Sequence, residues 1–345
     1  MSSFEVLIPP PEDRRRWLEL VDDPVAHEEI ARDLACLRSV DVEAPGEPAP
    51  LSGWLRVAVW NVERGRDPAA LAGLIARTGA HLVLLSEVDV GMARTGNVDV
   101  ARELGGYLSA GTAFAVEFVE LGLGKRADLP GVVDSVNRCG LHGNAIVTKT
   151  RLLDPDVVRL SSGDWFTHSR GEPRVGGRSA LVATILLDDV EVDVASVHLE
   201  SHSDAALRAA QMTTLLDRLD DRGRRPAIVG GDFNTFGAPL TELADRTSVS
   251  RMRTRDPTRF SWPVRFEPLF EVAAGRGFAW VEANVAAPTT THGPDGLPDH
   301  VPIKLDWILV RGLEARRPTV VRATGPDGTA LSDHDLLAVS VRIPS

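Results

Sequence analysis

Several strand-like runs of the sequence end in polar side chains that an apolar strand does not need. Asn61 follows LRVAVW, Glu87 follows HLVLLS and His198 follows VDVASV. The remaining members of this pattern are Asp232, Asn234, Asp306, Asp333 and His334. Each one alone could be a turn residue, a helix cap or a hydrogen-bonded core group. Because α/β scaffolds build sites from side chains at strand ends, the repetition predicts one common site.

The residue types in this set suit the hydrolysis of a phosphate ester. The carboxylates are hard oxygen donors that favour magnesium or manganese over zinc; they belong to Glu87, Asp232, Asp306 and Asp333. Converging carboxylates repel one another, so a divalent metal is their natural counter-ion. The two histidines could donate to a charged oxygen, and Asn61 and Asn234 could orient ligands without adding charge. In such chemistry a metal polarises a phosphoryl oxygen, a carboxylate directs water and histidines stabilise the developing charge.

The elements that must position these side chains alternate between strands and helices. The apolar pattern predicts helices over 67–79, 97–104 and 203–220, where Asp67, Asn97 and Ser203 stand at the N-termini. The predicted strands are 55–62, 81–88, 144–150, 179–187, 190–199, 227–230, 304–310, 319–323 and 336–343. Asp188 and Asp189 predict a tight hairpin between two of them. The segments 118–139, 154–178 and 247–264 are expected to be long loops, which often carry binding function.

Residues 1–50 differ from the rest of the chain, because two proline-rich runs flank a helical pattern over 24–38. We expect an N-terminal helical extension with a proline-rich linker, too short to form its own core, followed by a catalytic domain over 51–345. The chain of 345 residues has no apolar run long enough to span a membrane. Its N-terminus lacks the pattern of a secretory signal, so we expect a cytoplasmic protein. Two cysteines are too few for a disulfide framework or a zinc site.

The net charge of −11 disfavours tight, non-specific binding of nucleic acid. A local basic groove remains possible on such a chain. Lys125, Lys149 and Lys304 are the lysines of the sequence, so almost all the cations are arginines. This bias could reflect a GC-rich genome or the recognition of phosphate by the planar guanidinium.

The motifs around these strand ends together resemble the endonuclease/exonuclease/phosphatase superfamily. They are WNVERG, LLSEVD, GLHGNAIVTK, VHLES, GGDFNTF, KLDWILV and LSDHDLLAVSV, in the family's order from about residue 51 to the C-terminus. The resemblance implies an α/β fold, a four-layer α/β sandwich in which two mostly antiparallel sheets pack face to face with helices outside. It also implies a metal-dependent hydrolase of phosphoric esters that uses magnesium or manganese.

The resemblance also implies a role for each residue of the set. Glu87 would be the primary metal ligand, with Asn61 beside it and Asp333 assisting the metal or its waters. Asp232 would orient and deprotonate the attacking water, while Asn234 holds the phosphoryl group and that water. His334 would donate to a phosphoryl oxygen and Asp306 would fix its tautomer. His198 occupies the position of a second catalytic histidine in deoxyribonuclease-like and sphingomyelinase-like members.

Two departures from the family bear on the substrate. The tyrosine that the exonuclease III branch places near the phosphate has no counterpart here, because Tyr107 lies outside the matching motifs. Asp89 stands where deoxyribonuclease I carries a DNA-binding arginine. The stretch EVDVGMARTGN is instead similar to a loop of bacterial members. The candidate substrate-binding arginines are Arg94 in that loop and Arg170, Arg174 and Arg178 in SRGEPRVGGRSAL.

These observations favour a divalent-metal-dependent phosphoesterase acting on a phosphomonoester or phosphodiester of a small-molecule or lipid-derived substrate. The alternative is a nuclease for DNA or RNA on the same scaffold, which the net charge disfavours. A third alternative is an inactive binding module, but none of the key residues is missing. The sequence does not name the substrate, the number of metals or the oligomeric state.

Overall fold

The computed structural model describes residues 7–20, 23–161, 171–290 and 301–344, which form two β-sheets and their covering helices. The first sheet has eight strands in the order β1-β4-β5-β3-β2-β13-β12, and β7 pairs with β4. Its strands are β1 (Val40–Glu43), β2 (Leu55–Arg64), β3 (Leu82–Val90), β4 (Gly111–Glu120), β5 (Leu141–Thr148), β7 (Arg174–Gly176), β12 (Glu314–Val321) and β13 (Leu336–Arg342). Only β2 and β3 pair in parallel within this sheet, so it is mostly antiparallel.

The second sheet has five strands in the order β11-β10-β9-β8-β6. They are β6 (Leu153–Arg159), β8 (Ser179–Leu187), β9 (Val190–His198), β10 (Ala227–Asp232) and β11 (Asp306–Arg311). Strands β9 and β10 run parallel, and the other neighbours are antiparallel. The hairpin between β8 and β9 turns at Asp188 and Asp189, whose φ angles of 51° and 61° match a tight primed turn.

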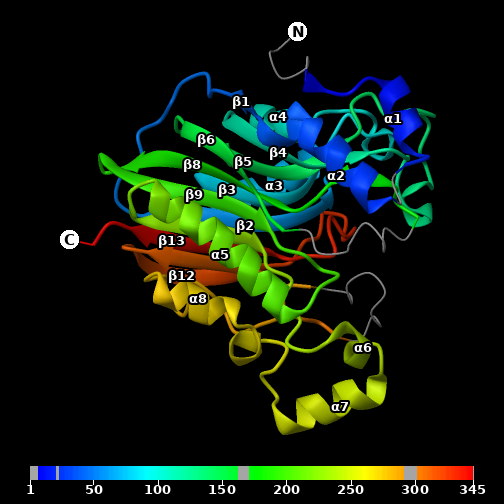
Figure 1. Cartoon of the computed structure of the whole chain (residues 1–345). Coiled ribbons are helices and arrows are strands. Elements are labelled where there is room, and N and C mark those ends of the chain that lie inside the picture. The colour runs from blue at the N-terminus through cyan, green and yellow to red at the C-terminus, as the bar shows by residue number, and fades with distance from the viewer. Residues whose placement is uncertain (1–6, 21–22, 162–170, 291–300, 345) are drawn as a thin grey trace.

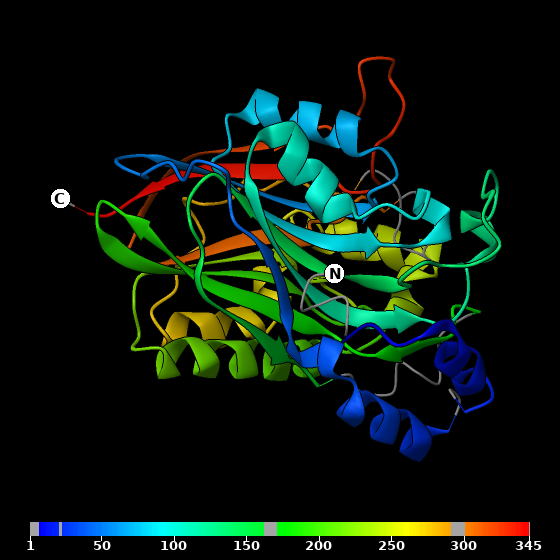
Figure 2. The ribbon, with the colours of Figure 1, turned by 90° about the horizontal axis from the view of Figure 1, so that it is seen from above.

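Helices cover the outer faces of both sheets, and the molecule therefore has four layers. The helices are α1 (Pro11–Trp17), α2 (Pro24–Asp33), α3 (Pro68–Thr78), α4 (Val100–Leu108), α5 (Ala205–Asp221), α6 (Leu240–Leu243), α7 (Arg246–Arg255) and α8 (Leu269–Gly275). Figure 2 shows the two sheets between the light-blue α3 and teal α4 at the top and the green α5 at the bottom. Helices α3 and α4 pack on the first sheet, and α5 and α8 pack on the second. Helices α6 and α7 lie apart from these layers (Figure 1).

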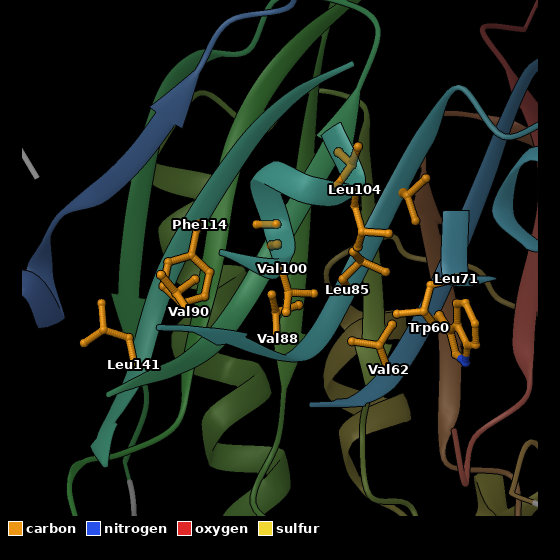
Figure 3. Close-up of a cluster of buried hydrophobic side chains, with 14 of the residues drawn as sticks. Trp60, Val62, Leu71, Leu85, Val88, Val90, Val100, Leu104, Phe114 and Leu141 are labelled. Atoms are coloured by element: carbon orange, nitrogen blue, oxygen red, sulfur yellow. The ribbon is translucent and has the colours of Figure 1, made fainter. Parts of the chain in front are cut away.

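The alternation of side chains along each strand builds three apolar layers. In β2, Val57 and Val59 join the core between the sheets, while Ala58, Trp60 and Val62 face α3 and α4. Figure 3 shows that outer cluster, where Trp60 and Val62 lie near Leu71 of α3. The same alternation in β10 places Ile228 between the sheets and Val229 against the helices. The fold predicted from the family resemblance is thus confirmed.

Several segments differ from the sequence-based prediction. The predicted long loops 154–178 and 247–264 contain strand β6 and most of helix α7, respectively. Strand β4 and the short edge strands β1 and β7 were not predicted. Strand β1 pairs with β4, and Trp17, Cys36 and Leu37 join the outer core, so part of residues 1–50 packs into the first sheet's layer. The boundary at residue 51 stays a prediction.

Candidate active site

Four of the expected site residues point into the space between the two sheets, because each continues an inward-facing alternation. Asn61 follows the inward Val57 and Val59 of β2, and Asp232 follows Ile228 and Gly230 of β10. His198 is the last residue of β9 and Asp306 is the first residue of β11. Each lies an even number of residues from inward-facing residues of its strand and therefore faces the same side. The facing sides of two rigid sheets therefore supply the site.

Strand pairing places the second sheet's residues in one row. His198 is the register partner of Asp232 across the parallel β9–β10 pair. Asp306 is the partner of Asp232 across the antiparallel β10–β11 pair. The three side chains thus lie next to one another at the end of the sheet, although more than a hundred residues separate the first from the last.

The first sheet is irregular where it meets this row. The pairing of β2 with β3 shifts between Asn61 and Arg64, and that of β3 with β5 shifts between Leu85 and Val88. Glu63, Arg64 and Glu87 have left-handed φ angles of 44°, 78° and 56°. Non-glycine residues adopt this conformation at a cost of about 1–3 kcal/mol each, and it clusters at functional sites. These bulges bring the Glu87 carboxylate beside Asn61, whose Nδ2 donates to Glu87 Oε1 at 3.0 Å.

Two hydrogen bonds join the sheets at the site. Asn61 Nδ2 also donates to Asp232 Oδ2 at 3.1 Å, and His334, just before β13, pairs through Nδ1 with Asp306 Oδ2 at 2.7 Å. Of the two glycines in the GGDFN motif, Gly230 allows the sheets to approach and Gly231 allows β10 to pair closely with β9. A Cβ on Gly230 would lie 2.5 Å from Val59 Cγ2, and one on Gly231, where φ is 155°, would lie 1.7 Å from a backbone oxygen of β9.

The Asp232 carboxylate lies at the centre of the site, where side chains from both sheets approach it. Besides the Asn61 amide, His198 Nε2 lies 3.6 Å and His334 Nε2 lies 3.7 Å from Asp232 Oδ2. Its other oxygen accepts from the backbone N–H of Asn234 at 2.9 Å, and Asn234 Nδ2 donates to Leu199 O at 2.8 Å. Two imidazole nitrogens and one amide thus surround a single carboxylate oxygen, which is the kind of cluster that can direct a water molecule and transfer its proton.

The backbone of His334 is held in place by two hydrogen bonds. Its carbonyl accepts from Trp60 Nε1 at 2.8 Å, and its backbone N–H donates to Ser332 Oγ at 3.0 Å. Burial alone would lower the pKa of His334, but the neighbouring carboxylates, above all that of Asp306, raise it well above the usual value. The ring is therefore suited to act as a charged donor.

His198 is held by a different partner. Arg178 Nη1 lies 2.8 Å from His198 Nδ1, and Glu117 Oε2 lies 3.3 Å from the same guanidinium nitrogen and 3.5 Å from the imidazole. The Glu117 side chain is fully buried and also accepts from Asn144 and Ser179. Glu117 was not predicted because β4 was not predicted; a glutamate in the middle of the apolar run GTAFAVEFVE was the available signal.

Three carboxylates, those of Glu63, Glu87 and Asp333, lie around Asn61 and influence one another electrostatically. Glu63 Oε2 accepts from the backbone N–H of Asp333 at 3.0 Å. Burial, with the Asp333 and Glu87 carboxylates, raises the pKa of Glu63 to about 7. Burial would raise the pKa of Glu87 too, but the Arg64 guanidinium bound to its carboxylate lowers it well below the usual value. Crowded oxygen donors of this kind fit a hard divalent cation.

Glu63 and Arg64 were not predicted, although they stand two and three residues after Asn61 in WNVERG. Arg64 is buried and reaches Glu87, Asp128 and Glu172. Among the described residues, the group that offers converging ligand atoms for a metal ion is Asp232, Asp306 and His334, whose ligand atoms lie within 4.8 Å of one another.

Of the expected substrate-binding arginines, the described ones, Arg94, Arg174 and Arg178, form ion pairs with buried carboxylates. The Arg94 side chain has no exposed surface and binds Asp89 at 2.7 Å and Glu172 at 2.6 Å. Arg174 pairs with Glu172 and Glu120, and its guanidinium covers the ring of Phe118. Arg178 contacts His198 as described above. Arg170 lies outside the described residues. The geometry therefore gives Arg94 no surface with which to contact a substrate.

A profile of the Endonuclease/Exonuclease/phosphatase family matches residues 58–334, which include every residue of the site described above. The chain belongs to this family. Its members are hydrolases, and the family's sandwich fold agrees with the four layers seen here. None of the curated proteins compared with the chain matched it.

Solved structures of the endonuclease/exonuclease/phosphatase family share this fold. One from Beutenbergia cavernae is 20% identical with a TM-score of 0.58, covering 85% of this chain and 72% of that chain. Family proteins from Bacteroides thetaiotaomicron and Bacteroides vulgatus are 15% and 17% identical, with TM-scores of 0.52 and 0.51. Both matches cover 85% of this chain. They cover 99% of the Bacteroides thetaiotaomicron protein and 100% of the Bacteroides vulgatus protein. At these identities the likeness concerns the fold.

Proposed function

We propose that this family member is a divalent-metal-dependent phosphoesterase that uses magnesium or manganese. The observation that supports the proposal is the convergence of three polar nitrogens on Asp232 Oδ2 beside the carboxylates of Glu63, Glu87 and Asp333. This arrangement joins a base, hydrogen-bond donors and a cation site, which phosphoester hydrolysis requires.

In this proposal Asn61, Glu87 and Asp333 hold the metal, with Glu63 as a further oxygen donor. The bound metal would polarise a phosphoryl oxygen and stabilise its charge. Glu87 has one oxygen on Arg64 and the other on Asn61, so both neighbours fix its orientation.

The protein's own side chains then handle water and protons. Asp232 orients the attacking water and accepts its proton, because its Oδ2 faces the space between the two imidazoles. His334 donates from Nε2 to a phosphoryl oxygen, while Asp306 holds Nδ1. Asn234 positions Asp232 through its backbone N–H, since its side-chain amide donates to Leu199. His198 supplies a second donor from the opposite side of Asp232.

The leading substrate class is a small-molecule or lipid-derived phosphoester, because the chain carries a net charge of −11. The second candidate is a nuclease activity. It is supported by residues 246–265, which contain six arginines and one aspartate and could therefore attract the phosphates of a nucleic acid. We place the protein in the cytoplasm in this proposal. Its two cysteines are not joined in a disulfide, which agrees with a reducing compartment. Among the described residues, no helix is long and apolar enough to cross a membrane.

A substrate panel tests the proposal. Purified protein would be assayed with magnesium or manganese against bis-(p-nitrophenyl) phosphate, sugar phosphates, phospholipids, DNA and RNA. Asp232→Asn is the matched control, because it preserves shape but removes the charge that accepts the proton. Metal-dependent hydrolysis by the wild type and its loss in Asp232→Asn are expected. Absence of hydrolysis across the panel, or equal rates in both proteins, would refute a phosphoesterase.

A further inference from the structure

The segment between the active-site strands β10 and β11 carries a separate lobe. We call residues 236–267, which include α6 and α7, the basic lobe. It leaves the site directly after Asn234, and residues 301–305 return beside it to Asp306. Figure 1 shows α6 and α7 outside the four layers. The lobe has its own small apolar core, made by Phe236, Leu243, Val249, Met252 and Phe260 with Val301, Ile303 and Leu305.

The basic lobe is attached firmly to the catalytic strands. Phe260 O accepts from the backbone N–H of Lys304 at 2.8 Å, two residues before Asp306. At the lobe's other end, Glu267 forms a doubly bonded ion pair with Arg208 of α5 and accepts from the backbone N–H of Gly237. The surface of α7 is therefore fixed relative to the active site.

The charge of the lobe is opposite to that of the molecule. The lobe has six arginines and four acidic residues, a net charge of +2 within a chain of −11, and its segment 246–265 holds all six arginines with one aspartate, a net charge of +5. Arginines make up about a tenth of the whole chain but three tenths of this segment, so the general arginine bias does not account for the cluster. Arg246, Arg251, Arg253, Arg255 and Arg265 are exposed. The acidic side chains at the two ends of α7 have local partners: Asp245 caps the helix, and Asp256 bonds Thr258 and Arg265.

One face of α7 is shaped for an anion. Arg246, Ser250, Arg253 and Thr254 share a helix face by their spacing and line a shallow hollow of ≈300 Å³ above the buried Val249. The Arg253 guanidinium lies 5.7 Å from the centre of the Phe260 ring, whose side chain belongs to the lobe's core. Two guanidinium groups beside a hydroxyl form the donor set that recognises phosphate oxygens.

We propose that this hollow binds backbone phosphates of a nucleic-acid strand whose scissile bond lies in the active site. The proposal rests on the nuclease candidate and names its substrate-holding surface. Helix α7 has ten residues and so spans about 15 Å, the rise of about four nucleotides along one strand. A membrane fits less well, because the exposed large apolar side chains of the described chain lie outside the lobe, and helices that bind bilayers insert such side chains.

The test measures binding by the full-length protein in EDTA, so that hydrolysis does not contribute. Fluorescence anisotropy would follow single strands and duplexes of about 20 nucleotides at roughly 50 to 200 mM salt. The test variant is Arg246→Gln/Arg253→Gln. The matched control is Arg77→Gln/Arg151→Gln, which removes two exposed arginines and the same charge elsewhere. We expect Kd to rise about tenfold or more in the test variant and the salt slope to fall by about 2, with little change in the control.

Two outcomes would overturn the proposal. Equal losses in both double variants would mean that net charge alone attracts the strand. Binding of anionic phosphatidylserine vesicles, lost in the test variant, without binding of nucleic acid would identify a membrane as the partner. Hydrolysis of bis-(p-nitrophenyl) phosphate by the same proteins separates this result from the proposed activity. The test variant should retain it, and failure of the wild type to hydrolyse it would refute the activity while leaving the binding result intact.

Discussion

Arg178 Nη1 lies 2.8 Å from His198 Nδ1, and this contact fixes the tautomer of the second imidazole at the site. A guanidinium can only donate hydrogen bonds, so Nδ1 must accept and the ring proton lies on Nε2. That Nε2–H faces Asp232 Oδ2 at 3.6 Å. His334 has the opposite arrangement, because its Nδ1 faces the carboxylate of Asp306. One cation and one anion thus orient the two imidazoles that face Asp232.

Replacing Arg178 by methionine should change the state of His198. The Glu117 carboxylate, 3.5 Å from His198 Nδ1, would then attract a proton to that nitrogen. We expect nitrogen NMR of labelled histidine to show an Nε2–H tautomer in the wild type and a protonated Nδ1 in Arg178→Met. The value of kcat should fall roughly tenfold or more with little change in KM, because a positioned donor is disturbed.

Arg178→Lys separates this role from mere packing, since lysine also donates and should retain part of the tautomer and of kcat. An unchanged histidine spectrum in Arg178→Met would show that Arg178 does not set the tautomer. A loss of activity without a spectral change would assign the arginine to another task.

The metal proposal makes a prediction for Glu87. Its carboxylate is bonded by Asn61 and Arg64, and neutralising it in Glu87→Gln removes an anionic ligand. The divalent cation concentration for half-maximal rate should rise at least about tenfold. Isothermal titration with manganese should show the same weakening without any turnover.

Glu282, an exposed glutamate far from these residues in sequence, provides the matched control as Glu282→Gln. Full activity after exhaustive chelation by EDTA would exclude a metal-dependent mechanism. Titrations that coincide for Glu87→Gln and the wild type would instead move the ligand role to another carboxylate.

The sequence predicts those features of the site that depend on neighbouring residues, and not those that depend on contacts between distant segments. The polar ends of β2, β3, β9, β10 and β11 were predicted, because apolar runs and their alternation are local. The alternation also decides which face Asn61 and Asp232 occupy, and both do face the space between the sheets. Their hydrogen bond, however, depends on the close approach at Gly230, which only the packed sheets reveal.

The arginines show where sequence reasoning is insufficient. Arg94 and Arg178 were predicted to contact substrate because they stand in presumed loops. Their guanidinium groups are bound by carboxylates from β3 and β4 and, for Arg178, by His198, and the substrate contact of Arg178 stays a prediction. Strand β4 itself was missed, although GTAFAVEFVE is largely apolar, so the buried acids that hold these cations were missed as well. An ion pair between distant segments leaves no periodic signal in either one.

The Asp306–His334 pair should behave as one unit. The two groups lie 2.7 Å apart, and His334→Ala should lower the rate by about 10²–10⁴, the range for a positioned acid or base. Asp306→Asn should also lower the rate, because it removes the charge that favours the imidazolium form. Since residues that act together are not additive, the double variant should be little worse than His334→Ala. Turnover of the two single variants and the double variant measures this coupling, and losses that simply multiply would show that the residues work independently.

Lys304 should make the stability of the fold depend on pH above neutrality. Its side chain is fully buried, and its ammonium group donates to Asp306 O at 3.0 Å and lies 4.4 Å from the centre of the Trp307 ring. Burial lowers the pKa of Lys304 to about 7, from 10.5 in an exposed lysine. Between these values the unfolded chain holds a proton that the folded chain lacks, so the free energy of unfolding contributed by Lys304 rises with pH.

The expected gain is about 2 kcal/mol between pH 7 and 9, because each pH unit is worth about 1.4 kcal/mol and the folded lysine is already half deprotonated at pH 7. Urea denaturation of the wild type and Lys304→Met at several pH values measures it as the difference between the two proteins, in which other titrating groups cancel. Lys149 is exposed, so Lys149→Met should parallel the wild type across the same range. If the Lys304→Met curve also runs parallel to the wild type, the buried lysine keeps its proton in the folded state, and the Trp307 ring and the Asp306 carbonyl stabilise its charge.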